Sequence, residues 1–192
     1  MEIRVGFPED QRAVAAALYD EAFKRKLAPM IPDDGQRRAV LADCLDPQRG
    51  VVAVLDGQLV GLAGFHYDER SFTGAGGWGT LFEHLGLWGT LRAAVGFALF
   101  ERTPEPDELL MDGICVAAEA RGQGLGTRLL RALCDHGREL GLARVRLDVI
   151  DTNPGARRLY EREGFVAGET VRVGWMRDIF GFSASTTMTK AL

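Results

Sequence analysis

The chain reads GICV at residues 113–116 and RGQGLGT at residues 121–127, and an amphipathic pattern follows. This order predicts a short apolar strand that leads into a glycine-rich loop at the start of a helix. The first turn of a helix has backbone N–H groups without helical partners and carries the positive end of the helix dipole. Such a turn binds anions, most often phosphate. We therefore expect this chain to hold a phosphorylated cofactor.

The composition is that of an ordinary soluble globular protein. Of the 192 residues, 46% are apolar and 26% are charged, and this length favours one domain over residues 1–192. The formal net charge is −4, and the basic residues are scattered along the chain. A protein that binds nucleic acid normally has a basic excess, so we expect no nucleic-acid partner.

Three cysteines lie far apart in the sequence: Cys44, Cys115 and Cys134. This spacing fits neither a disulfide framework nor a metal site. We expect buried, reduced thiols, no metal and a cytoplasmic protein. The first residues also lack the charged-then-apolar order of a signal peptide.

Residues 81–100 form the only stretch that resembles a membrane span. Polar residues interrupt it at Glu83, His84, Thr90 and Arg92. A spanning helix needs about 20 predominantly apolar residues, so we expect no membrane partner. We interpret the stretch as a buried or partner-facing helix within a helical insertion over about residues 70–106, which begins with a glycine-rich loop at 71–79.

The hydrophobic pattern predicts a mixed α/β or α+β domain with seven strands and four or five helices. We expect strands at residues 2–6, 50–55, 58–66, 109–116, 145–149, from 164–166 onward, and 186–190. We expect helices at about residues 8–27, 36–45, 81–100, 124–140 and 153–163. The predicted core stripes are Val14, Leu18 and Ala22 on the first helix, and Leu125, Leu129, Leu133 and Leu140 on the fourth.

Two other glycine-loop chemistries fit less well. The triphosphate-binding loop needs a lysine after its glycines, and none lies near this loop. The dinucleotide loop follows Gly-x-Gly-x-x-Gly directly after a strand. Asp148, 22 residues after Gly126, could serve as its ribose-binding acid, but the spacing here is Gly-x-Gly-x-Gly and the glycines begin several residues after the strand. A dehydrogenase therefore stays a distant alternative.

The loop at residues 121–126 resembles the Arg/Gln-x-x-Gly-x-Gly/Ala acyl-CoA loop of the GNAT N-acyltransferase superfamily. A second match follows at residues 153–165, NPGARRLYEREGF, which resembles the family's Asn-x-x-Ala-x-x-Leu-Tyr-x-x-x-Gly-Phe segment. Residues 188–192 are similar to the family's last strand. The specific resemblance covers about residues 109–190.

This resemblance implies a single mixed, mostly antiparallel seven-stranded sheet whose parallel pair, 109–116 and 145–149, splays apart. An unpaired strand edge can accept an extended ligand like an added strand. The pantetheine arm of acetyl-CoA would bind the backbone of Ile114, Cys115 and Val116. The pyrophosphate would lie on a loop formed by Arg121, Gly122, Gln123, Gly124, Leu125, Gly126 and Thr127. Arg121 could reach a phosphate or position the loop.

The resemblance also implies direct attack by an amine on the acyl-CoA carbonyl. Tyr160 matches the tyrosine that often protonates the CoA sulfur, with an aromatic that only packs below Phe165 as the alternative. Asn153 is expected to cap a helix and to contact the pantetheine. Asp112 is the first choice for the general base, with a structural carboxylate as the alternative; it shares a face with Ile114 and Val116 unless a bulge, plausible at Gly113, intervenes.

Other bases remain open: His66, Glu83 and His84. Acceptor specificity is expected in residues 25–36, 70–106 and 172–184, which contain Trp78, Trp88, Trp175, Phe180, Phe182, Asp33, Asp34 and Asp178. Aromatic and acidic side chains suit an amine acceptor. We expect an acetyl-CoA-dependent N-acetyltransferase that acts on a small molecule or peptide amine, with a homodimer left open. A non-catalytic acyl-CoA-binding regulatory module is the alternative.

Overall fold

Seven strands form one sheet in the order β1-β2-β3-β4-β5-β7-β6. The computed structural model describes residues 1–100, 102–174 and 177–192. The strands are β1 Glu2–Val5, β2 Gly50–Leu55, β3 Gln58–His66, β4 Glu108–Val116, β5 Arg144–Ile150, β6 Val166–Arg172 and β7 Ala184–Ala191. Every neighbouring pair is antiparallel except β4 and β5. This confirms the predicted fold class, a mixed and mostly antiparallel sheet with one parallel pair.

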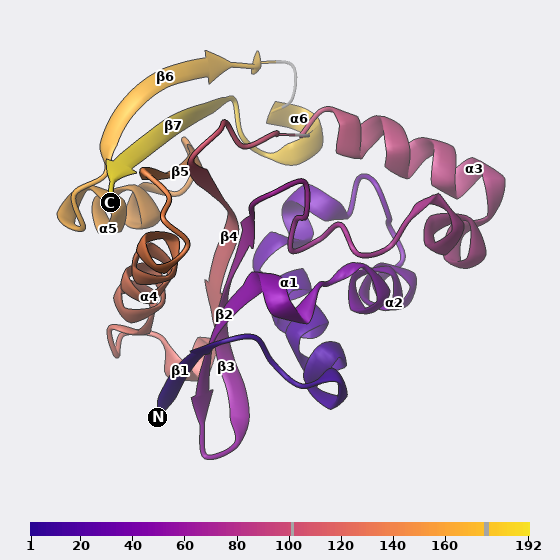
Figure 1. The fold of residues 1–192 in the computed structure, drawn as a ribbon. Coiled ribbons are helices and arrows are strands. Elements are labelled where there is room, and N and C mark those ends of the chain that lie inside the picture. Colours follow the sequence, from indigo (N-terminus) through magenta and orange to yellow (C-terminus); the bar gives the residue numbers. More distant parts are fainter. Residues whose placement is uncertain (101, 175–176) are drawn as a thin grey trace.

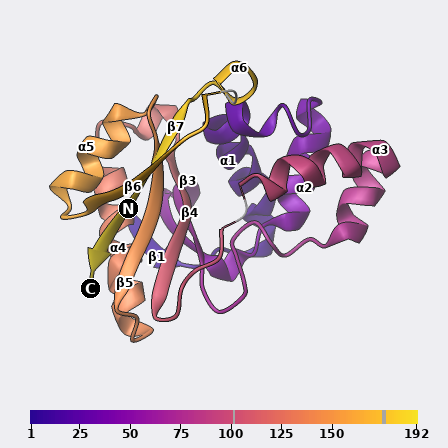
Figure 2. The same ribbon diagram turned by 90° about the horizontal axis from the view of Figure 1, so that it is seen from above.

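Helices cover both faces of the sheet (Figures 1 and 2). They are α1 Arg12–Leu27, α2 Asp34–Cys44, α3 Trp78–Ala98, α4 Leu125–Glu139, α5 Pro154–Arg162 and the single turn α6 Arg177–Phe180. A Cβ on Gly113 of β4 would lie 2.5 Å from the Phe23 ring of α1, whereas a Cβ on Gly61 of β3 would lie 3.0 Å from Leu129 of α4. Glycines on both faces therefore let α1 and α4 approach the sheet closely.

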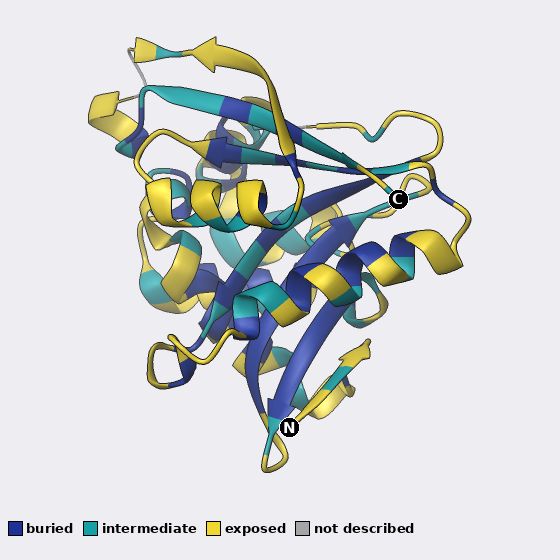
Figure 3. Cartoon of the chain, turned by 90° about the vertical axis from the view of Figure 1, so that its left-hand side faces the viewer, coloured by how far each residue is buried: buried dark blue, intermediate teal, exposed yellow. Residues whose placement is uncertain are grey.

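The core confirms three of the four residues of the predicted α4 stripe but only Leu18 of the predicted α1 stripe. Leu125, Leu129 and Leu133 are buried, and Leu140 lies just past the helix with 37% of its surface exposed. On α1, Val14 and Ala22 are exposed instead of buried. Figure 3 shows the dark blue strands behind the exposed outer turns of α4.

The α1 prediction holds only for Leu18, because the neighbouring stripe of Ala15, Tyr19 and Phe23 turns toward the sheet in place of Val14 and Ala22. Tyr19 and Phe23 pack with their ring centroids 4.4 Å apart, above the gap left by Gly113. Both i, i+4 stripes are apolar, so periodicity alone could not choose between them. A short 3-10 turn, Glu9–Gln11, also precedes α1, which begins at Arg12 and not at Pro8.

The insertion contains one broken helix. α3 begins at Trp78, within the predicted loop, and ends at Ala98. Gly86 interrupts it with φ 62° and ψ −176°, a conformation that favours glycine. α3 packs on α2 and lies at the margin of the molecule (Figure 2). None of the helices in the described part of the chain is long and apolar enough to cross a membrane.

The parallel pair β4–β5 forms a fork. Its register holds for only three pairs, Glu108 with Arg144, Leu109 with Val145 and Leu110 with Arg146. Beyond Leu110, no pairing between the two strands occurs among the described residues. This is the predicted splay.

A buried carboxylate fastens the root of this fork. The side chain of Glu108 is 1% exposed and accepts hydrogen bonds from Arg146 Nε at 2.7 Å and Arg144 Nε at 2.9 Å. Two charged donors from β5 therefore compensate the loss of water around Glu108. The pairing at the root is held by these ion pairs as well as by the backbone.

Replacing Glu108 tests this role. Glu108→Gln removes the buried charge and leaves two guanidinium groups without their carboxylate, so we expect a loss of about 3 kcal/mol in the free energy of unfolding. Glu105→Gln is the matched control, because Glu105 also pairs with Arg144 but is 66% exposed; we expect a loss below about 1 kcal/mol. Urea denaturation measures both, and equal losses would contradict the role of Glu108.

Candidate active site

The open part of the fork presents free backbone groups. In an antiparallel pair such as β3–β4, about half of a strand's N–H and C=O groups point away from its partner. On β4 these groups face β5, which has already separated at residues 111–116. An extended ligand with amide groups can hydrogen-bond there as an added strand would. Ile114, Cys115 and Val116 all lie on this segment.

The side chains of this segment alternate between the two faces. Ile114 and Val116 pair with Ala63 and Gly61 of β3, and the Gly61 side faces α4. Cys115 points the other way, is buried, and has its pKa raised to about 12 by that burial. The thiol therefore stays protonated and inert at neutral pH. All three cysteines are free and buried, as predicted.

A β-bulge at Asp112 breaks this alternation. Gly64 of β3 pairs with Gly113, but the next residue, Phe65, pairs with Met111, so Asp112 is the extra residue. Asp112 therefore does not share a face with Ile114 and Val116. The expectation that these three side chains share a face is therefore wrong. The bulge that would reverse it, which the sequence made plausible at Gly113, is present next to that residue.

Asp112 points toward α1 and the start of the insertion. Its Oδ2 accepts a hydrogen bond from the backbone N–H of Phe72 at 2.9 Å, and Thr73 N–H donates to the same carboxylate. Burial raises the pKa of Asp112 to about 6, although these two donors and the charge of Lys26 oppose the shift. A carboxylate with a pKa near neutrality can take up a proton during a reaction.

The glycine loop has the geometry expected of an anion site. Gly122 and Gly124 have φ values of +78° and +74°, with open space where a side chain would stand. The first hydrogen bond at the start of α4 runs from Arg128 N–H to the Gly124 carbonyl at 3.1 Å. The N–H groups of Leu125, Gly126 and Thr127 precede it and are available to a ligand.

Arg121 of the loop at 121–127 has a structural role. Arg121 Nε donates to the Val116 carbonyl at 2.9 Å, and its Nη2 lies 3.3 Å from Glu21 Oε1 of α1. Arg121 thus positions the loop, which was one of its two expected roles. Leu125 is buried, so its backbone and not its side chain faces the loop. Gln123 is exposed.

The helix α5 carries the second motif. Asn153 Oδ1 accepts the backbone N–H of Ala156 at 3.0 Å, which confirms the predicted N-cap. Tyr160 is 4% exposed, and its ring centroid lies 6.0 Å from that of Phe165. Burial raises the pKa of Tyr160 to about 12, so the phenol is neutral and can donate its proton. No described residue makes a hydrogen bond with its hydroxyl.

The loop and the tyrosine helix are adjacent. A Cβ on Gly126, in the first turn of α4, would lie 3.5 Å from Leu159, the neighbour of Tyr160. Arg131 of α4 also makes a bidentate pair with Glu163 at 2.7 and 2.9 Å, just past α5. The tertiary structure thus places the two motifs side by side.

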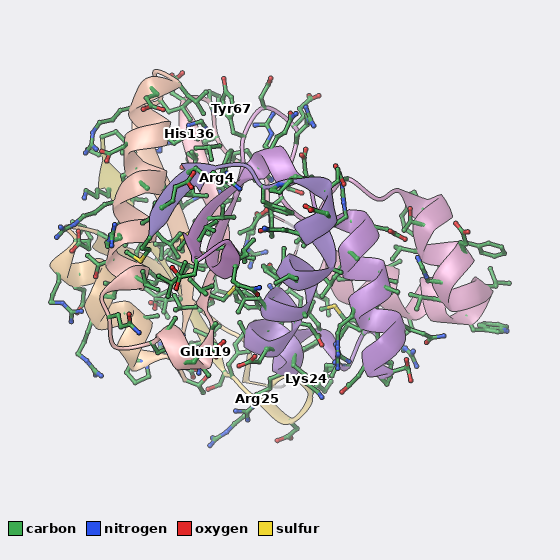
Figure 4. All side chains as sticks on the ribbon, turned by 90° about the horizontal axis from the view of Figure 1, so that it is seen from below. Arg4, Lys24, Arg25, Tyr67, Glu119 and His136 are labelled. Carbon is green, nitrogen blue, oxygen red and sulfur yellow. The ribbon has the colours of Figure 1, made fainter. Side chains whose placement is uncertain are left out.

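Three segments meet on the α1 side of the fork: the C-terminal part of α1, the residues after α3, and residues 180–182. Each belongs to a region that was expected to select the acceptor. Lys26 of α1 lies 4.4 Å from the ring centroid of Phe100, which packs edge-on against Phe180 at 4.9 Å. Phe182 completes this aromatic cluster. Arg25 approaches Gly181 closely, near the lower edge of Figure 4. Trp175 lies outside the described residues.

Charged groups line the same region. Arg102 Nε lies 3.6 Å from Asp148 Oδ2 on β5, and Thr187 Oγ1 donates to Asp148 at 2.6 Å. Asp112 and Asp148 each stand two residues beyond the last pair of the fork, on opposite strands. Lys26 and Arg102 lie in segments expected to select the acceptor, but the sequence did not single them out, because no motif marks a residue that tertiary contacts bring to the site. The described residues contain no cluster that could hold a metal ion.

The other candidate bases, His66, Glu83 and His84, lie in environments that differ from that of Asp112. His84 Nε2 lies 2.7 Å from Asp43 Oδ2 of α2, and Glu83 is exposed on α3. His66 pairs with Leu110 at the root of the fork, and burial lowers its pKa. Of the acceptor residues proposed from the sequence, Trp78 and Trp88 point to solvent, with 70% and 79% of their surface exposed.

The sequence is similar to those of known acetyltransferases. A family model described as Acetyltransferase (GNAT) family matches residues 13–165. The spermine/spermidine N(1)-acetyltransferase of Bacillus subtilis is 37% identical over 78 residues, which cover 37% of this chain and 51% of that protein. The streptothricin acetyltransferase of Streptomyces lavendulae is 31% identical over 105 residues, which cover 55% of this chain and 49% of that protein. The chain spans about half the length of these curated relatives.

Solved structures show the same fold. A ribosomal-protein-alanine N-acetyltransferase from Brucella melitensis superposes with a TM-score of 0.65 at 21% identity, covering 100% of both chains. A crystal structure described as an acetyltransferase gives a TM-score of 0.66 at 22% identity, covering 100% of this chain and 99% of the other. At this identity the likeness concerns the fold alone.

The raised pKa of Asp112 predicts a pH-dependent effect on stability. The fold favours the protonated form, so the stability that Asp112 contributes is present below about pH 4 and lost as the pH rises to about 6. Asp112→Asn keeps an oxygen acceptor for the Phe72 N–H but cannot ionise. Relative to the wild type, its free energy of unfolding should therefore rise by up to about 3 kcal/mol between pH 4 and pH 7.

Urea denaturation at the two pH values measures this difference. Asp10→Asn changes an exposed aspartate and is the control, for which we expect no such trend. A pH-independent difference between Asp112→Asn and the wild type would refute the buried, titrating carboxylate.

Proposed function

The chain belongs to the GNAT acetyltransferase family, and we propose that it transfers an acetyl group from acetyl-CoA to a primary amine of a small molecule or peptide. It is an acyltransferase enzyme, as its family and its acetyltransferase relatives indicate. The observation that carries the proposal is the fork with free β4 backbone groups, beside a loop of free N–H groups and the helix of Tyr160.

The chain offers a distinct surface for each part of the cofactor. The backbone of Ile114, Cys115 and Val116 would bind the pantetheine amides, and Asn153 would contact the same arm. The N–H groups of the loop at 121–127 would hold the pyrophosphate. The residues fit this ligand, because the left-handed glycines leave the loop without side chains over its N–H groups. Bound acetyl-CoA supplies the activated thioester carbonyl.

Two residues would move protons. The amine nitrogen forms the new C–N bond as the C–S bond breaks, and the thiolate leaves with the bonding electron pair. Asp112, with its pKa of about 6, would take the proton that the amine loses. Tyr160, neutral because burial raises its pKa, would donate a proton to the sulfur. Acid and base then act from opposite sides of the fork.

The relatives guide the choice of acceptors. One of them is named for spermine and spermidine, and another for streptothricin, so small-molecule amines come before peptides in a test panel. Release of free thiol from acetyl-CoA in the presence of each amine measures the reaction. Amine-dependent release supports the proposal. Binding of CoA without turnover on any amine would favour the alternative, a non-catalytic acyl-CoA-binding regulatory module.

Tyr160→Phe separates a chemical role from a packing role. The phenylalanine keeps the ring against Phe165 but removes the proton donor, so kcat should fall by about a hundredfold while CoA affinity and the melting temperature stay unchanged. Tyr67→Phe is the matched control, because Tyr67 lies by a turn at the end of β3 and not on α5. Unchanged kcat in Tyr160→Phe with intact CoA binding would leave the tyrosine a packing residue.

The raised pKa of Asp112 predicts how kcat/KM changes on the acid side of the pH profile. A base with a pKa of about 6 is active when deprotonated, so kcat/KM should fall about tenfold per pH unit below that value. Asp112→Asn should lose most of the activity and flatten this limb, while its carboxamide still accepts the Phe72 N–H. A wild-type profile and an Asp112→Asn profile of the same shape would show that another group is the base.

A further inference from the structure

The fully buried residues of the helix α3 are small, while most of its large apolar residues lie outside; Leu81, Leu85 and Phe97 are partly buried against the core. Thr90, Ala93 and Gly96 are buried, and a Cβ on Gly96 would lie 2.5 Å from Met30. Most helices on a protein surface show the opposite pattern, with polar residues toward water. The small residues let α3 pack closely on the body of the protein. The large apolar side chains on the opposite side of α3 therefore have no cover from the described residues.

The uncovered surface is large. We call it the outer face of α3, and it consists of Trp78, Phe82, Leu87, Trp88, Leu91, Val95 and Leu99, which are 38% to 79% exposed. From the size of such side chains, their exposed apolar area is on the order of 800 Å². A typical monomer exposes no apolar patch above about 600 Å². A standard interface buries about 800 Å² per partner, which this face alone provides.

We propose that the outer face of α3 binds the same face of a second copy of this chain. A two-fold axis makes such a contact self-complementary and closed. The two copies of α3 would then run antiparallel, with their apolar side chains between them. The face also lies at the margin of the molecule, where a partner would not obstruct the fork (Figure 2).

The charges of α3 favour this occupant. Glu83 and Arg92 are its exposed charged residues, nine positions apart and on opposite sides of the break at Gly86. Antiparallel packing centred between them brings Glu83 of one protomer toward Arg92 of its partner, twice by symmetry. Arg92 Nε also donates to the Met30 carbonyl at 3.0 Å, which holds its guanidinium in place.

The charges of α3 do not favour binding to a lipid surface. Helices that lie on membranes carry lysine and arginine around the apolar face. Within α3, Arg92 is the single lysine or arginine, and the whole chain has a formal net charge of −4. A second copy thus explains both the apolar side chains and the paired opposite charges.

Charged substitutions in the outer face test the contact. We expect the wild type to sediment as a dimer at micromolar concentration, and Trp88→Glu and Leu91→Glu to sediment as monomers with unchanged far-UV circular dichroism. Each glutamate would be buried without a partner in the dimer. Val171→Glu is the matched control, because Val171 is 46% exposed on β6, and it should stay dimeric. A monomeric wild type, or dimeric Trp88→Glu and Leu91→Glu, would overturn the proposal.

A charge exchange tests the orientation. Glu83→Arg and Arg92→Glu should each weaken dimerisation several-fold because like charges then meet, and the double variant should restore it. A double variant that is weaker than both single variants would exclude the antiparallel register. Co-sedimentation with vesicles of neutral and anionic phospholipid tests the other occupant. Binding of the wild type to vesicles as a monomer would also overturn the proposal.

Discussion

The separation of β4 from β5 is the constraint on which the rest of the site depends. Two parallel strands normally share hydrogen bonds along their whole length, and here they share them for three residue pairs. Glu108 holds the root with two arginines of β5, and the bulge at Asp112 begins where the pairing has ended. The unpaired backbone of β4 is then available to a ligand, because no other strand among the described residues pairs with it there; its Val116 carbonyl already accepts a hydrogen bond from Arg121 Nε.

The two carboxylates along β4 illustrate how local partners set the chemistry. Glu108 is buried among two guanidinium groups, which bring full charges of opposite sign. Asp112 accepts neutral backbone N–H groups instead, and burial raises its pKa to about 6. Neutral donors compensate a buried charge less than cations do. One carboxylate therefore fastens the strands, and the other can exchange a proton near neutral pH.

The insertion connects the candidate acceptor region with the outside of the molecule. Its C-terminal part brings Phe100 and Arg102 to the fork, where they meet Lys26 and Asp148. Its outer face carries apolar side chains that the described part of the chain does not cover. If two copies pair through α3, the same element that borders the acceptor region is held by a partner, which would restrain its position.

The sequence by itself determined the sheet, most helices, the glycine loop and the capped helix of Asn153, because these follow from short-range periodicity, turn chemistry and capping. Only the tertiary structure decided which face of α1 is buried, on which side of the sheet Asp112 lies, and that Lys26 and Arg102 join the site. The α1 helix has two apolar stripes, and packing on Gly113 selects one of them. A bulge of one residue reverses strand parity, and it depends on the register with β3 rather than on any local pattern.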